Sequence, residues 1–226
     1  TKGKGQLIIV DGVFSMEGDI CDLPSIVKIA KTYGARVMVD DAHGIGVLGA
    51  GGRGTAEHFA LENEVDIIMG TYSKSLAAIG GFVAGSYKAI NYIKHVGRSM
   101  IFSASLPPAL VASVSTALDI IEEQPQLRTQ LWKNTHKLLK GYKELGYDTG
   151  TSETPIVPII IKDNMKTYEM CKLLFENGVF VNPVVNPAVP LGRELLRTSY
   201  MATHTEQQLD HVLSAFKKVG HQLELI

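Results

Sequence analysis

Three short apolar runs recur along the first third of the chain, at residues 7–10, 36–39 and 66–69. Between the first two, apolar residues from 23 to 33 fall on one helical face, and Gly34 follows as a helix stop. A strand–helix–strand order at this spacing favours a parallel sheet. We therefore predict an α/β fold whose first part holds a mostly parallel sheet.

The pattern changes to an α+β order after the Pro107-Pro108 pair. Residues 205 and 208 form a capping-box pair, Thr and Gln, at the start of the last predicted helix. We predict one domain over residues 1–110 and a second, α+β domain over residues 111–226. The helices and strands predicted for the second part are 109–123, 127–145, 158–161, 167–176, 179–181, 195–200 and 206–224.

Composition excludes several classes of protein. The 226 residues are 45% hydrophobic and 20% charged, with a net charge of −1, which is typical of a soluble globular protein. A near-neutral balance gives no electrostatic case for a nucleic-acid partner. Cys21 and Cys171 lie far apart, which suits a reducing compartment, and we expect a cytoplasmic protein without a transmembrane helix, a signal peptide or a metal site. The chain does not begin with Met, and we expect it to be part of a longer polypeptide.

Lys74 is the first candidate for chemistry. It follows an apolar strand and hydroxyl residues, and a run of small residues, 77–81, comes after it. A lysine amine at the end of a buried strand, with little bulk around it, can form a Schiff base with a carbonyl cofactor such as pyridoxal 5′-phosphate (PLP). The alternative is an ordinary surface lysine at a strand end.

Asp40 and His43 are the second candidate pair. They lie where the apolar run 36–39 ends, beside a further carboxylate, Asp41. Adjacent buried carboxylates are costly without a cation, and a pyridinium ring would supply one. Asp40 would accept its N–H and keep the ring protonated, while His43 would reach the phenolic oxygen. The alternative is a capping aspartate with a loop histidine.

Other polar residues fit the same cofactor. The hydroxyl of Ser15 is predicted to touch the ring or to hold Asp40, unless it serves only as a turn residue. Thr71 and Ser73 are predicted to bind phosphate, and their alternative role is to cap a turn. Arg197 lies within an apolar strand, where it needs an anion. A substrate carboxylate and a structural ion pair both remain open as that anion.

Four motifs occur in order along the chain: Asp40-Asp41-Ala42-His43-Gly44, Gly70-Thr71-Tyr72-Ser73-Lys74-Ser75, Phe102-Ser103-Ala104-Ser105-Leu106-Pro107-Pro108, and Leu196-Arg197-Thr198 through Thr205. Together they resemble the α-oxoamine synthases, PLP enzymes that join an amino acid to an acyl-CoA. The resemblance implies a fold-type I, aminotransferase-like architecture. In it, this chain supplies the later part of the large PLP domain and all of the C-terminal domain.

The same resemblance implies individual roles. Lys74 would be the Schiff-base lysine and the base for the Cα proton, Asp40 the partner of the pyridine nitrogen and His43 that of the phenolic oxygen. Thr71 would contact the phosphate, and Arg197 would hold the amino-acid carboxylate. The segment Ser103-Ala104 would reach the phosphate of the other subunit's PLP, so the resemblance implies a homodimer with shared active sites.

Within the family, residues 79–83 and 181–185 are most similar to bacterial members that condense L-serine with a long-chain acyl-CoA. Members that act on glycine and acetyl-CoA, or that make 8-amino-7-oxononanoate, remain alternatives. So do an aminotransferase, a non-catalytic partner subunit and a peripheral membrane contact. Family members carry a phosphate loop and a ring-stacking histidine upstream of the first strand seen here. The resemblance thus implies that this chain alone binds PLP poorly.

Overall fold

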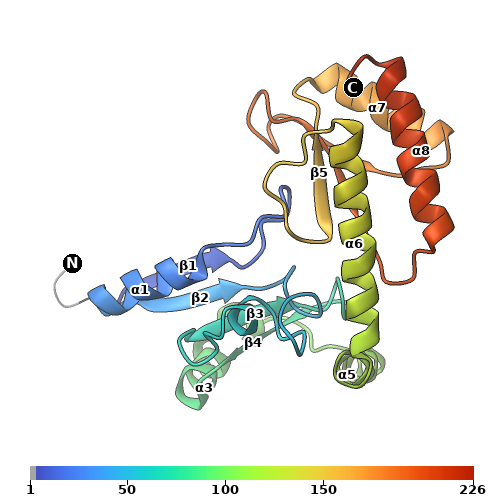
Figure 1. Cartoon of the computed structure of the whole chain (residues 1–226). Coiled ribbons are helices and arrows are strands. Elements are labelled where there is room, and N and C mark those ends of the chain that lie inside the picture. Colours follow the sequence, from blue (N-terminus) through green and yellow to red (C-terminus); the bar gives the residue numbers. More distant parts are fainter. Residues whose placement is uncertain (1–3) are drawn as a thin grey trace. The chain divides into compact units, whose positions relative to one another are not determined.

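The computed structural model describes residues 4–226, which form two compact units (Figure 1). The first unit holds the chain up to Val13 together with Cys21–Pro125. The second holds Phe14–Ile20 and Gln126–Ile226. In these residues, no helix combines the length and the hydrophobicity needed to cross a membrane.

The first unit is built on a four-stranded sheet in the order β1-β2-β3-β4. Strands β1, β2 and β3 run parallel, and β4 is antiparallel to β3. This agrees with the predicted α/β class and the mostly parallel sheet. The elements are β1 (Leu7–Asp11), α1 (Leu23–Tyr33), β2 (Arg36–Asp40), α2 (Thr55–His58), β3 (Ile67–Thr71), β4 (Gly81–Gly85), α3 (Tyr87–Val96), α4 (Arg98–Ile101) and α5 (Pro108–Glu123).

Helix α1 begins and ends where its sequence requires. The Asp22 side chain accepts a hydrogen bond from the backbone N–H of Ser25, and Gly34 closes the helix in the left-handed conformation at φ 65°. Its apolar face, including Leu23 and Val27, shares a core cluster with Val37 of β2. The helix therefore covers one face of the sheet.

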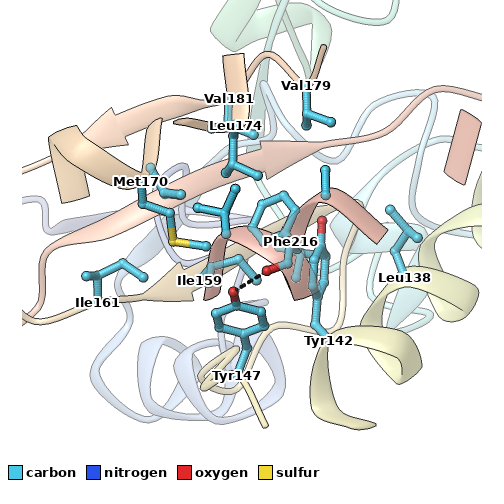
Figure 2. Packing of buried hydrophobic residues seen from close by; sticks show 14 of the residues in the cluster. Leu138, Tyr142, Tyr147, Ile159, Ile161, Met170, Leu174, Val179, Val181 and Phe216 are labelled. Carbon is cyan, nitrogen blue, oxygen red and sulfur yellow. Dashed lines mark hydrogen bonds between the residues drawn. The ribbon is translucent and has the colours of Figure 1, made fainter. Parts of the chain in front are cut away.

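The second unit is built on a three-stranded antiparallel sheet in the order β5-β7-β6. Its core joins the sheet to three helices around Tyr142, Tyr147 and Phe216, as Figure 2 shows. The Tyr147 hydroxyl donates a hydrogen bond of 2.8 Å to the Phe216 carbonyl, so the buried phenol has a partner. The elements are α6 (Pro125–Leu145), β5 (Ile156–Ile160), α7 (Asn164–Glu176), β6 (Asn182–Val184), β7 (Leu195–Ser199) and α8 (Glu206–Gln222).

One strand of the second unit differs from the prediction. The apolar run 179–181 lies outside the strand, and β6 begins at Asn182. Val179 and Val181 are both 6% exposed and belong to the core. Their hydrophobicity therefore reflects burial beneath the sheet rather than strand pairing.

Candidate active site

Two loops leave the same edge of the first sheet. Asp40, the last residue of β2, pairs with Met69 of β3, and Thr71 at the end of β3 pairs with Gly81 at the start of β4. Residues 41–54 therefore follow β2 at this edge, and residues 72–80 connect β3 to β4 there. The carboxyl edge of parallel strands is where α/β proteins place their ligands.

Asp40 ends β2 and His43 lies in the loop that follows it, and both are half-buried. Oδ1 of Asp40 accepts a hydrogen bond of 3.1 Å from the backbone N–H of Ala42. This bond orients the carboxylate and leaves the acceptor capacity of its second oxygen for another donor, such as a pyridinium N–H. His43 lies in a tight turn, which the N–H of Gly44 closes on the Asp41 carbonyl at 3.0 Å.

The loop after β3 carries Lys74 and is closed by its own backbone. The N–H of Tyr72 donates to the Gly80 carbonyl at 2.9 Å, and the N–H of Ala78 donates to the Tyr72 carbonyl at 2.7 Å. Two residues beyond Lys74, the Leu76 side chain is 1% exposed and anchors the loop in the interior. The lysine is thus an exposed residue on a constrained loop.

Hydroxyl groups gather beside this lysine. The Thr71 and Ser73 hydroxyl oxygens lie 2.8 Å apart, and the N–H of Ser73 donates to Oγ1 of Thr71 at 3.2 Å. Neutral hydroxyl donors of this kind suit the oxygens of a phosphate group. The polar groups at this edge therefore fit PLP. They are a carboxylate for the ring N–H, a histidine for the phenolic oxygen, hydroxyls for the phosphate and a lysine amine for the aldehyde.

The two loops are joined by a direct hydrogen bond. The Ser75 hydroxyl donates to the carbonyl of Ile45 at 2.8 Å. Between them, Gly46 adopts a φ of 80°, and an added Cβ would lie 2.7 Å from the Cβ of Ser75. The loop that carries Lys74 therefore packs tightly against the loop that carries His43.

Ser103 and Ala104 lie between α4 and α5 of the same unit, and both are exposed. The Ser103 hydroxyl donates to the backbone carbonyl of Ser99, which closes a turn after α4. The neighbouring Phe102 side chain is 79% exposed. This segment thus presents small polar residues next to an uncovered aromatic ring.

Ser15 and Arg197 both belong to the second unit, whereas the other predicted site residues belong to the first. Nε of Arg197 donates to the backbone carbonyl of Ser15 at 2.6 Å. Burial of the guanidinium lowers the pKa of Arg197. Within residues 4–226 no carboxylate pairs with Arg197, so the structural ion pair considered from the sequence is not formed there. Arg197 also lines a cavity of about 680 Å³, together with Tyr200 and His204.

Sequence reasoning missed several residues that build these loops. The Asp41 carboxylate is fully buried and bonds to Thr55, while Ser75 and Leu76 fix the lysine loop. The adjacent aspartates were a signal for Asp41, because two carboxylates at one strand end require separate partners. Thr55 gave no local signal, because it lies 14 residues further along the chain.

Comparison with known proteins identifies the class. The model of the family "aminotransferase class I and II" matches residues 1–216, and the chain belongs to this family. Its architecture is the fold-type I, aminotransferase-like α/β fold, of which this chain contains part of the large domain.

Within this family, the chain is similar to two groups of enzymes. The chain is 53% identical to a serine palmitoyltransferase of Sphingobacterium spiritivorum over 98% of this chain and 56% of the relative. It is 48% identical to an 8-amino-7-oxononanoate synthase of Thermoanaerobacter pseudethanolicus, over 100% of this chain and 57% of that protein. A variant serine palmitoyltransferase from S. paucimobilis, solved with a bound PLP–myriocin aldimine, has a TM-score of 0.96 at 36% identity, with 100% of this chain and 57% of that chain covered. The chain thus spans a little over half the length of these relatives.

Proposed function

We propose that this chain is part of a PLP-dependent acyltransferase that condenses L-serine with palmitoyl-CoA. The products are 3-ketosphinganine, CO₂ and CoA, which is a first step toward sphingolipids. One observation carries the proposal. At the edge where β2 and β3 end, Asp40 ends β2, His43 lies in the loop after it, and Lys74 lies in the adjoining loop after β3. The 53% identity to a serine palmitoyltransferase over nearly the whole chain supports the choice of substrates.

In this proposal Asp40, His43, Thr71, Ser73 and Lys74 hold the cofactor. PLP, when bound, supplies an electron sink for the negative charge that develops at the amino-acid Cα. Asp40 keeps the ring nitrogen protonated, and His43 orients the ring through its phenolic oxygen. Thr71 and Ser73 donate to the phosphate. Lys74 holds the cofactor covalently before substrate enters, and its amine then removes the Cα proton.

The residues of the second unit are proposed to bind substrate. Arg197 is half-buried, and its Nε is directed to the Ser15 carbonyl, so its remaining N–H groups can grip a carboxylate in the bidentate manner. The Ser15 hydroxyl is proposed to contact the ring or Asp40. We propose that residues 1–110 belong to the cofactor domain and residues 111–226 to the C-terminal domain.

We also propose a cytoplasmic homodimer in which Ser103 and Ala104 reach the PLP phosphate of the other subunit. The exposure of this segment and of the aromatic ring of Phe102 supports a surface that a partner covers. Sedimentation of the holoenzyme made from the complete polypeptide should show a dimer. A monomer that retains full activity would contradict this part of the proposal.

Substrate choice is tested by CoA release from the same holoenzyme with matched substrate pairs. We expect release with L-serine and palmitoyl-CoA, and at least about tenfold slower release with glycine and acetyl-CoA. The opposite order would overturn the assignment in favour of a glycine C-acetyltransferase. Release with L-alanine and pimeloyl-CoA alone would favour an 8-amino-7-oxononanoate synthase, which the 48% identity to such an enzyme keeps as the second candidate.

The role of Lys74 is tested by exchange of the Cα proton of bound amino acid with solvent. Lys74→Ala should slow this exchange by about a thousandfold, the typical contribution of a general base. Lys88→Ala removes an exposed lysine of α3 and should leave the exchange rate unchanged. Exchange at the wild-type rate in Lys74→Ala would show that another group is the base.

A further inference from the structure

A buried carboxylate separates the two proposed cofactor ligands of the β2 loop. Asp41 is 0% exposed, and its carboxylate bonds to Thr55, which is also buried. Its Oδ2 accepts from the Thr55 backbone N–H at 2.7 Å, and its Oδ1 accepts from the Thr55 hydroxyl at 2.6 Å. One residue therefore satisfies both oxygens of the carboxylate.

The space around this carboxylate admits only glycine at three places. A Cβ added at Gly12, Gly44 or Gly54 would collide with the Asp41 carboxylate. Gly54 also adopts a φ of 97°, which disfavours any other residue there. The backbone of three separate segments thus approaches the same side chain, which leaves Asp41 no room to change its rotamer.

The backbone of Asp41 is equally constrained. Its N–H donates to the Met69 carbonyl of β3 at 2.8 Å, and its carbonyl accepts from the N–H groups of Gly44 and Ile45 at 3.0 and 3.1 Å. All the hydrogen-bonding groups of this residue are therefore used. Asp41 ties the turn that contains His43 to the end of β3 on one side and to Thr55 on the other.

Burial of the ionised Asp41 carboxylate costs free energy, because the group loses its hydration. The two bonds to this carboxylate come from neutral donors, the hydroxyl and the backbone N–H of Thr55. Loss of hydration raises the pKa of its carboxyl group, while the bonds from Thr55 oppose that rise. A cost of this kind, at a position between Asp40 and His43, suggests a role in arranging those two side chains.

We propose that Asp41, held by Thr55, is a positioning residue that fixes the Asp40-to-Gly44 turn so that the Asp40 carboxylate and the His43 ring face the cofactor. This inference rests on the proposed PLP chemistry, because the two side chains that it positions are the proposed partners of the ring. Asp41 touches neither substrate nor cofactor in this scheme.

A matched control exists at the opposite end of the same sheet. Asp66 precedes β3, and its Oδ1 and Oδ2 accept from Nη1 of Arg36 at 2.8 Å and from the N–H of Val37 at 2.9 Å. Asp66→Asn is therefore the same substitution as Asp41→Asn, at another carboxylate with two bonded oxygens. Because Asp66 is the more exposed of the two, the decisive readouts are the dichroism of bound PLP and the separate changes in kcat and KM, not the stability of the variants.

The test compares Asp41→Asn, Thr55→Val, Thr55→Ser and Asp66→Asn in the complete polypeptide. In the apo-enzyme, Asp41→Asn and Thr55→Val should speed amide hydrogen exchange at Gly44 and Ile45 at least about tenfold, and Asp66→Asn should not.

In the holoenzyme, Asp41→Asn and Thr55→Val should alter the visible circular dichroism of bound PLP. They should also lower kcat by about a hundredfold, with KM for the amino acid changed less than about threefold, since a small misplacement of reacting groups has this size of effect. Thr55→Ser, which keeps both donors, should restore the wild-type values.

Wild-type dichroism and kcat in Asp41→Asn and Thr55→Val would overturn the proposal. So would equal losses of kcat in Asp41→Asn and Asp66→Asn. If Asp41→Asn does not fold, Thr55→Val and Thr55→Ser decide the question by the same readouts. A wrong choice of substrates leaves the test intact, because the amide exchange and the dichroism are measured without acyl-CoA. Failure of the complete wild-type polypeptide to bind PLP would instead refute the proposed function itself.

Discussion

In the second unit, strand β5 is buried along its whole length, whereas in the first unit Leu7 and Ile9 of β1 are 49% and 63% exposed. Helix α1 covers one face of the first sheet, and the opposite face of its edge strand keeps large apolar side chains in solvent. The second sheet instead packs against helices around a dense aromatic core. Within residues 4–226, the apolar core of the second unit is therefore the larger of the two.

Buried carboxylates occur in both units, Asp41 in the first and Glu194 in the second. In the first unit, two carboxylates organise the long loop after β2: Asp41 binds Thr55, and Glu57 accepts from the N–H groups of Gly51 and Arg53. In the second unit, the aromatic cluster contains Tyr142, whose ring lies 4.8 Å from that of Phe216. Buried carboxylates therefore fix loop backbone in both units, and the second unit adds the larger apolar and aromatic core.

The largest effect expected from this comparison is loss of the aromatic core. Phe216→Ala should lower the free energy of unfolding of the second unit by about 3–5 kcal/mol, because it removes a fully buried ring and leaves a cavity. Hydrogen exchange of β7 and α8 amides under denaturant measures this. Phe175→Ala, at a side chain that is 67% exposed on α7, should cost less than about 0.5 kcal/mol. Similar losses in the two variants would show that the aromatic core is not the source of stability.

A smaller effect is expected for a loop carboxylate of the first unit. Glu57→Gln should lower the local free energy of opening by about 1–3 kcal/mol, because a nearly buried carboxylate loses its charge-assisted bonds to backbone N–H groups. Exchange rates of the Gly51 and Arg53 amides report this opening. Glu62→Gln removes only an exposed partner of Arg53 and should cost clearly less than Glu57→Gln, because solvent screens the pair. If Glu62→Gln proved the more damaging, the loop would depend on its surface pair instead.

The capping box of α8 gives a further, smaller test in the second unit. The Thr205 hydroxyl accepts from the N–H of Gln208, and the Gln208 side chain accepts from the N–H of Thr205. Thr205→Ala should cost about 1 kcal/mol, measured by exchange of the first-turn amides of α8. Thr205→Ser keeps the hydroxyl acceptor, so it should leave the stability of the helix nearly unchanged. If Thr205→Ser lost as much stability as Thr205→Ala, the methyl group of Thr205 would be the source of the effect.

The reactivity of the two cysteines compares the two units, because Cys21 lies in the first and Cys171 in the second. Burial raises the pKa of Cys21, in the first unit, to about 11, and it also raises that of Cys171, in the second. Because the pKa of Cys21 is higher when folded, its contribution to stability is present at low pH and is lost as pH rises from about 8.5 toward 11. At pH 8, a thiol reagent should label Cys171 faster than Cys21. Faster labelling of Cys21 would mean that the first unit opens readily around α1.

The local patterns predicted most of the elements because each depends on neighbours in the chain. Gly34 ends α1 through its left-handed conformation, and Thr205 with Gln208 begins α8, as their sequence positions indicate. Run 179–181 misled the prediction, because a buried valine looks the same whether it pairs in a strand or packs beneath one. Roles for Lys74, Asp40 and His43 came from their residue types at strand ends and from the order of the four motifs, and they stay predictions.

The sequence by itself determined the α/β class, the parallel strands β1 to β3 and the placement of Asp40 at the end of a strand and of Lys74 just after one, because periodicity and strand ends are local properties. Only the tertiary structure decided how the loops at that edge are held. The bond from Ser75 to Ile45 and the burial of Asp41 against Thr55 join residues 30 and 14 positions apart. It also placed Ser15 beside Arg197, 182 positions away. Contacts of this kind follow from chain crossings, which no local pattern encodes.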